Sequence, residues 1–405
     1  MKLNSASLGL APFALTAITI TGLYTAAESL CSAFVGLYLL KNSGDLKTVL
    51  LHYLALYGSL PIFFVFAGWY AQAHDKLHVY RLGIMLHTVY YALLLYLQNR
   101  APDHAVELGL LMGLTWGIFY AAANTIHFDV SSNGRRGYYL GLLTSVNGFF
   151  QLAAPLVSGI VIHLFPERNV GYEIIFTFAI ALYCACFLIT FRLPNDRVGK
   201  PFRFPAAVFP KRQQRDWRMA LLSATLQLGI DVVMVITMPL LMFLETSSEF
   251  SVGGFASFQA LAFIIVAFFV GRSISTSWRK RYMLIGAIAT LAGGIVLAID
   301  IRLATIVFYG FMRAIGEPMF GIPQSTIRWN IISSTITGPA ERIPYLCAFE
   351  VSLGLGRVLA LAPIVIAFYF YPTSPAIIGI ALLILGIARF GVMFVLNSTN
   401  EVKNA

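Results

Sequence analysis

Long apolar stretches separated by short polar ones dominate this chain. Each stretch is about as long as the roughly 20 residues that a helix needs to cross a bilayer, and none shows the strict alternation of a transmembrane β-strand. The stretches lie at residues 9–40, 46–73, 80–97, 106–129, 138–164, 172–191, 218–244, 252–274, 282–299, 303–329, 343–370 and 375–396. The pattern therefore predicts an all-α membrane protein with twelve transmembrane helices.

The composition agrees with this pattern and excludes other classes of protein. Of the 405 residues, 58% are hydrophobic and 11% are charged, with a mean hydropathy of +0.77. A soluble domain carries about 25% charged residues, so a soluble enzyme and a disordered chain are both excluded. The four cysteines lie inside apolar stretches, which predicts neither a disulfide framework nor a metal site.

Basic residues predict the orientation of the chain in the membrane. If the N-terminus is cytoplasmic, 20 of the 28 Lys and Arg residues lie on the cytoplasmic side or at its edge. Only Lys41, Lys47, Arg100, Arg168 and Arg302 lie opposite. Positive charge concentrates on the cytoplasmic side of membrane proteins, so we expect both termini in the cytoplasm and place the protein in a prokaryotic cytoplasmic membrane.

A basic, proline-containing segment at 192–217 divides the chain into six-helix halves at 1–191 and 218–405. It either contacts anionic lipid headgroups or only enforces the topology. We expect no nucleic-acid partner, because the orientation rule already demands this positive charge.

The two halves share a faint internal repeat. Gly68 and Gly83 match Gly271 and Gly286, each 203 positions further on. Repeats of this kind are typical of transporters in which two related bundles enclose a central binding site. We therefore predict two pseudo-symmetric six-helix bundles around a central cleft.

Twelve spans, a basic central loop and a repeat near 200 residues resemble the major facilitator superfamily over the whole chain. The loop signature of that superfamily is only partly present at 68–76, which lacks the early acidic residue. Gly148, Ala154, Pro155 and Gly159 in the fifth span resemble an eroded antiporter signature. This resemblance implies a drug/proton antiporter-like exporter.

Two carboxylates lie in the middle of apolar spans. Glu28 in the first span and Asp231 in the seventh are 203 positions apart, the same offset as the glycine pairs. In the resembled superfamily, spans 1, 4, 7 and 10 line the cleft. A charge in hydrocarbon costs about 2.5 kcal/mol or more, so such residues are commonly functional. We predict a proton-coupling or substrate role for both; the alternative is a structural hydrogen bond to a neighbouring helix.

The tenth span contains Arg313 and Glu317, which share one helical face. Either Arg313 holds an anionic substrate group while Glu317 exchanges protons, or the two residues neutralise each other as an ion pair. Pro318 and Pro323 remove backbone hydrogen bonds, which suits a gating hinge or a polar lining.

Aromatic and amide side chains form a candidate cleft lining. Trp116, Tyr120 and Asn124 in the fourth span recur every four residues and share a face. Together with Gln227 we predict that they line the cleft, where aromatic walls suit amphipathic or cationic ligands. Packing against lipid or another helix is the alternative.

The remaining charged residues in the spans suggest structural roles. Glu350 and Arg357 share a face of the eleventh span and predict a salt bridge between helices rather than a ligand contact. Arg389 is expected to extend to the cytoplasmic surface. His87 is expected to be a hydrogen-bonded structural histidine.

A cytoplasmic latch is one interpretation of Asp75 with Arg135 and Arg136, which would separate as the halves rock. The alternative is that these residues are only solvated helix ends.

The sequence contains no phosphate-binding loop, metal-ligand spacing or nucleophile constellation. We therefore expect no enzyme, no catalytic residue, no cofactor and no metal.

These observations predict a secondary active transporter that moves a small solute by alternating access. The expected partners are the solute, protons and membrane lipids, and the expected working unit is a monomer. We favour proton-coupled export of an amphipathic or cationic compound. A proton symporter importing a polar or anionic metabolite is the first alternative, and a lipid flippase is the second.

Overall fold

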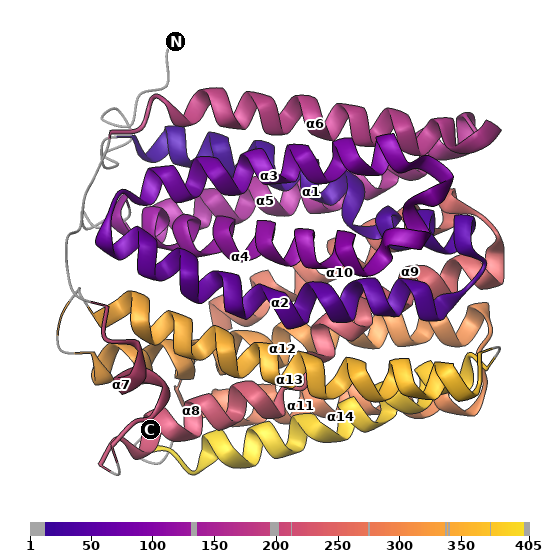
Figure 1. Cartoon of the computed structure of the whole chain (residues 1–405). Helices are drawn as coiled ribbons and strands as arrows, with labels where there is room; N and C mark the ends of the chain where they lie inside the picture. Colours follow the sequence, from indigo (N-terminus) through magenta and orange to yellow (C-terminus); the bar gives the residue numbers. More distant parts are fainter. Residues whose placement is uncertain are drawn as a thin grey trace.

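Long helices that run side by side make up the structure (Figure 1). The computed structural model describes residues 13–130, 136–194, 202–211, 213–273, 276–336, 338, 341–372 and 374–400. The α-helices are α1 (Ala14–Ser43), α2 (Leu46–Ala73), α3 (Lys76–Leu97), α4 (Ala105–Val130), α5 (Arg136–Leu164), α6 (Val170–Thr190), α7 (Phe204–Val208), α8 (Arg215–Leu226), α9 (Ile230–Thr246), α10 (Glu249–Ser273), α11 (Arg279–Ile299), α12 (Leu303–Thr335), α13 (Arg342–Phe370) and α14 (Ala376–Asn397).

The twelve predicted crossings agree with these helices. Ten stretches of the described residues are long and apolar enough to cross a membrane. One of the ten holds both α3 and α4, and another holds α8 and α9 as a single broken crossing. Helix α12 is not among the ten because Arg313, Glu317 and other polar residues lower its hydropathy. Counting α3 and α4 separately and adding α12 gives twelve crossings of a multi-pass membrane protein.

The seventh crossing is broken where the sequence predicts one continuous helix. Leu228 and Gly229 have φ angles of 49° and 54°, so the chain leaves the right-handed helix between α8 and α9. Left-handed geometry is uncommon for a residue other than glycine. The corresponding residues 203 positions earlier, Thr25 and Ala26, lie inside the unbroken helix α1. The break places Gln227 and Asp231 on either side of an irregular backbone segment.

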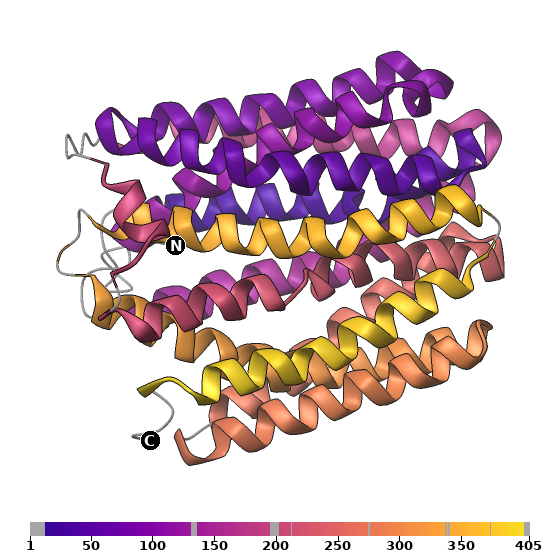
Figure 2. The same cartoon turned by 60° about the horizontal axis from the view of Figure 1, so that its bottom comes forward.

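Packing within each half is dense, and two helix pairs join the halves. Helix α1 packs on α5 and α6, and α2 packs on α4, while α11 packs on α12 and α14. Helix α5 packs on α10, and α2 packs on α13, as both views show (Figures 1 and 2). Helix α7 and the start of α8 lie within the predicted linker, where the Trp217 indole donates to the Ala207 carbonyl at 2.8 Å. The exact domain boundaries stay a prediction.

Helix α7 lies at one end of the bundle, where α1 begins and α14 ends (Figure 1). We call it the α7 end.

Candidate functional site

Glu28 on α1 is a buried carboxylate without a cationic partner among the described Lys and Arg residues. The Tyr183 hydroxyl on α6 donates to Glu28 Oε2 at 3.0 Å, and His87 Nε2 lies 4.0 Å from the same oxygen. Glu28 Oε1 is buried, and no described residue hydrogen-bonds to it. The buried Trp116 indole N–H lies close enough to Glu28 for a weak side-chain interaction, although the contact does not meet the geometry of a hydrogen bond. A buried carboxylate in this setting is costly as an anion.

His87 is held as a neutral, hydrogen-bonded residue, as expected. Its Nδ1–H donates to the Gly83 carbonyl at 2.8 Å, so its Nε2 accepts from the Tyr24 hydroxyl, also at 2.8 Å. The Tyr24 ring stacks on Phe119 with centroids 3.6 Å apart. Aromatic rings from four helices therefore surround Glu28 with an environment of low polarity.

The carboxylates of the second half share one arginine. Arg389 on α14 forms ion pairs with Glu317 on α12 and, at 3.5 Å, with Asp231 on α9. The Gln227 amide donates to the other Asp231 oxygen at 2.5 Å. Arg389 is 3% exposed, so the expectation that it reaches the membrane surface is wrong. Two acids on facing helices hold its guanidinium inside the bundle.

Arg313 does not form the predicted ion pair with Glu317, because Glu317 is bound to Arg389 instead. The Nε atom of Arg313 is buried and has no hydrogen-bond partner among the described residues. Helix α12 continues through Pro318 and Pro323, both buried, so a hinge at these prolines stays a prediction.

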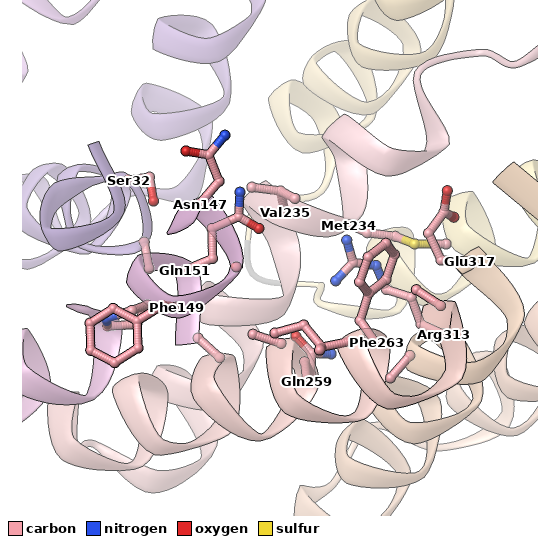
Figure 3. A pocket seen from close by; sticks show the side chains of 18 of the residues that line it. Ser32, Asn147, Phe149, Gln151, Met234, Val235, Gln259, Phe263, Arg313 and Glu317 are labelled. Atoms are coloured by element: carbon pink, nitrogen blue, oxygen red, sulfur yellow. The ribbon is translucent and has the colours of Figure 1, made fainter. Parts of the chain in front are cut away.

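A cavity of about 980 Å³ lies between α1, α5, α9, α10 and α12 (Figure 3). Arg313 and Glu317 are part of its wall, and so are amide and hydroxyl side chains that the sequence analysis did not select. These additional polar side chains are Ser32, Thr144, Ser145, Asn147, Gln151 and Gln259. A neighbouring cavity of about 780 Å³ shares Thr144 and Glu317 and reaches Leu140, near the start of α5, and Trp329, near the end of α12. The hollow thus extends from the middle of the bundle toward the α7 end.

The four predicted lining residues are not among those that border these two cavities. Trp116 lies beside Glu28, and Tyr120 packs edge-on against Tyr24 with centroids 6.2 Å apart. Asn124 is exposed on α4, and Gln227 caps the broken end of α8. The first two therefore belong to the surroundings of Glu28, and Gln227 to those of Asp231.

Glu350 and Arg357 form an ion pair of 2.5 Å within α13, not between helices as predicted. Their spacing of two helical turns lets the long arginine side chain reach back along its own helix. The contact between helices is instead a cation–π interaction, with the Arg357 guanidinium 5.5 Å from the centre of the Tyr57 ring on α2. Arg357 also lies against Gly229 at the break, so it stands where the two halves meet.

The halves are in contact at the end opposite α7. Lys41 on α1 pairs with Glu249 on α10 at 3.1 Å, and the Tyr172 hydroxyl donates to the same carboxylate at 3.3 Å. A Cβ atom on Gly159 of α5 would lie 2.8 Å from the Glu249 carbonyl oxygen, so only glycine permits this close approach. The eroded motif of the fifth span therefore serves the contact between α5 and α10.

The predicted cytoplasmic latch lies largely outside the described residues. Arg135 is not described, and nothing is described of the Arg136 side chain at the start of α5. Asp75 is 2% exposed and caps α3 by accepting from the Leu77 N–H at 2.9 Å. A latch role for Asp75 with the two arginines stays a prediction.

Buried charges around a cavity that reaches one end of a helical bundle define a class of protein, the secondary transporters. The family model of the Major Facilitator Superfamily matches residues 16–343. The chain belongs to the Major Facilitator Superfamily.

Three similar proteins support this assignment. The nucleoside transporter NupG, solved as a point mutant, superimposes with a TM-score of 0.71 at 14% identity, covering 95% of this chain and 98% of that one. The peptide transporter POT in complex with sulfate gives the same TM-score and identity, covering 95% and 93%. The uncharacterized protein YqgE of Bacillus subtilis (strain 168) is 24% identical over 344 residues, 85% of this chain and 80% of the relative. The two structural matches show the shared fold.

Proposed function

We propose that this protein is a proton-coupled secondary active transporter of a small solute, in which Glu28 loads and releases the proton. The observation that carries the proposal is the setting of Glu28, with one buried oxygen unbonded and no cationic partner among the described residues. Burying a carboxylate in this way is less costly when it is protonated. A conformation that admits water to Glu28 favours release of the proton, so proton binding and conformation are linked.

The second half contributes a charged cluster beside the cavity. Asp231 and Glu317 share Arg389, and Glu317 is part of the cavity wall. The cavity of about 980 Å³ is at the upper end of the 300–1,000 Å³ typical of small-molecule sites. The similar folds are titled transporters of nucleosides and of peptides, which supports a solute of modest size.

The orientation in the membrane is part of the proposal. Basic side chains gather at the α7 end, among them Arg81, Arg192, Arg203, Lys211, Arg215 and Arg218. By the positive-inside rule this end faces the cytoplasm of a bacterial cell. The cavity is then open to the cytoplasm, and the contact between Lys41 and Glu249 closes the outer side. Either import or export follows from the gradients, because a coupled carrier is reversible.

Export of a cationic compound has less support from the site than from the sequence pattern. The acid in the cavity wall, Glu317, is in an ion pair with Arg389. The cation in the same wall, Arg313, has a buried donor without a partner among the described residues. A cationic solute in the cavity would therefore meet the positive charge of Arg313.

The test is a flux screen with the purified protein in proteoliposomes that contain a pH-sensitive dye. Nucleosides, dipeptides, organic anions and organic cations are added as separate pools, under an imposed pH gradient. Glu28→Gln should reduce gradient-driven uptake about 5- to 150-fold, the range expected when 1–3 kcal/mol of coupling is lost. Exchange of labelled for unlabelled solute, which needs no net proton movement, should continue.

Glu107→Gln is the matched control, because Glu107 is an exposed carboxylate in the first turn of α4. It should behave like the wild type in both assays. Proton-coupled uptake by Glu28→Gln at the wild-type rate would overturn the proposal.

A further inference from the structure

The cavity has hydrogen-bond donors on two sides and apolar side chains between them. Helix α12 supplies Arg313, and helix α5 supplies Asn147 and Gln151 on the other side (Figure 3). Val235 of α9 lies between them in this view, and Met234 of α9 and Phe263 of α10 lie beside Arg313 (Figure 3). A ligand that fits this wall needs polar groups at two ends and an apolar middle.

The buried, unpartnered polar atoms that the structure describes in the cavity wall are donors. Arg313 Nε and Gln259 Nε2 are both buried without a hydrogen-bond partner among the described residues. The Asn147 carbonyl oxygen accepts from the Thr25 hydroxyl at 3.0 Å, so its amide N–H groups are the part left for a ligand. An unsatisfied buried donor costs about 1–3 kcal/mol, which a ligand with matching acceptors recovers.

The charges around the cavity favour an anion. Asp231 and Glu317 share Arg389, whereas Arg313 forms no ion pair with a described residue. Arg328 is also close enough to interact electrostatically with both acids. Three arginines therefore surround two acids, and in a medium of low polarity this arrangement attracts an anion to Arg313.

Resting on the proposed function, we infer that the solute is a small organic anion: a carboxylate at one end, an uncharged hydrogen-bond acceptor at the other, and an apolar segment between them. Arg313 and Gln259 bind the carboxylate, and Asn147 with Gln151 binds the second acceptor. Arginine is suited to the first role because its planar N–H groups match a carboxylate.

Binding is tested with (ω−1)-oxo carboxylates of five to ten carbons, from 4-oxopentanoate upward, as the probes. The primary amide and the primary ammonium analogue of each carboxylate keep its shape and change its charge. Dissociation constants are measured calorimetrically with the full chain in detergent at constant ionic strength. At least one carboxylate should bind about 10- to 150-fold more tightly than its amide, which corresponds to a hydrogen bond with a charged group. The ammonium analogue should bind more weakly still.

Two substitutions locate the site. Arg313→Gln should remove the preference for carboxylate over amide, whereas Arg302→Gln, at an exposed arginine, should keep it. Gln259→Glu serves if Arg313→Gln fails to fold: its added negative charge should weaken carboxylate binding and leave amide binding unchanged.

The inference is overturned if amides or ammonium compounds bind as well as carboxylates, if no member of the series binds at millimolar concentration, or if Arg313→Gln retains the preference. These outcomes are separate from those for coupling. If Glu28→Gln uncouples the flux of a cation, only the substrate class is wrong. If carboxylates bind but their flux ignores the pH gradient, only the coupling is wrong.

Discussion

Glu28 and Asp231 occupy positions 203 residues apart in the two halves, yet their surroundings differ in charge. Glu28 is enclosed by Tyr183, His87 and other aromatic side chains. Asp231 shares Arg389 with Glu317. Protonating Glu28 would leave no described Lys or Arg unpaired, whereas Asp231 and Glu317 together compensate the charge of Arg389. The comparison teaches that acids at matching positions of the two halves have different electrostatic surroundings: the first lacks an arginine or lysine partner among the described residues, and the second belongs to a charged cluster.

The backbone near these two acids differs between the halves as well. Helix α1 runs unbroken past Glu28, while the seventh crossing breaks two residues before Asp231. The break brings the Arg357 side chain against Gly229 and leaves Gln227 free to bond Asp231. The first half thus holds its acid on a continuous helix, and the second half holds its acids in an irregular, charged site beside the cavity.

The largest expected effect comes from removing the arginine of the second half. Arg389→Met removes the buried cation that Glu317 and the partly exposed Asp231 share, and breaking a buried pair costs up to about 3–5 kcal/mol. Reversible unfolding in detergent should show this loss as a lower midpoint. Adding Asp231→Asn and Glu317→Gln to Arg389→Met should restore most of the stability.

Glu28→Gln is the matched change in the first half, and it should alter stability by less than about 1 kcal/mol because no ion pair is broken. Equal losses for Arg389→Met and Glu28→Gln would contradict the contrast between the halves. Arg302→Met provides a baseline, since its partner Asp300 is exposed and such pairs contribute about 0–1 kcal/mol.

The next effect tests the difference in backbone. Gly229 has a φ of 54°, and a Cβ there would lie 2.7 Å from Arg357 Cγ. Gly229→Ala should therefore cost at least about 1–2 kcal/mol in the same unfolding assay. The reciprocal change, Ala26→Gly in α1, should cost only about 0.5–1 kcal/mol. If Gly229→Ala is as stable as the wild type, the break is not a requirement of the fold.

Much of the fold follows from the sequence pattern. The parts that do not follow from it differ for a physical reason. An apolar stretch of bilayer length specifies a crossing without reference to its neighbours. The break at Gly229 falls inside the apolar stretch 218–244, which is long enough to be one continuous crossing. It depends on how Arg357 and Gly356 pack against it, which is tertiary information.

The sequence also predicts part of the candidate site: its charged residues, but not their partners. Glu28, Asp231, Arg313 and Glu317 stand out because each is a charge within an apolar span. Their partners do not stand out, since Tyr183 lies 155 residues from Glu28 and is one of 19 tyrosines. Arg389 gave a usable signal: it lies eight residues before the end of α14, deeper than a side chain reaching the surface requires.

The smallest expected effect concerns the contact that holds the halves together at the end opposite α7. Lys41 and Glu249 are partly exposed, at 35% and 13% of their side chains, so the pair contributes about 0.2–1 kcal/mol. In the proposed cycle α1 and α10 separate when this end opens, so losing the pair favours the state that is open at this end by that amount.

Lys41→Ala should therefore raise the population open on this side about 1.5- to 5-fold. The measurement is the rate at which an impermeant maleimide labels Ala260→Cys, a cavity position, from that side of oriented vesicles, with the four native cysteines replaced. Lys41→Arg should keep the wild-type rate of labelling, and the charge exchange Lys41→Glu with Glu249→Lys should restore that rate.

Raising the salt concentration to 1 M should speed labelling of the wild type but not of Lys41→Ala, since salt screens exposed charges. If Lys41→Ala labels like the wild type at low salt, the pair does not hold the halves together, and closure at this end depends on the glycine contact between α5 and α10 alone.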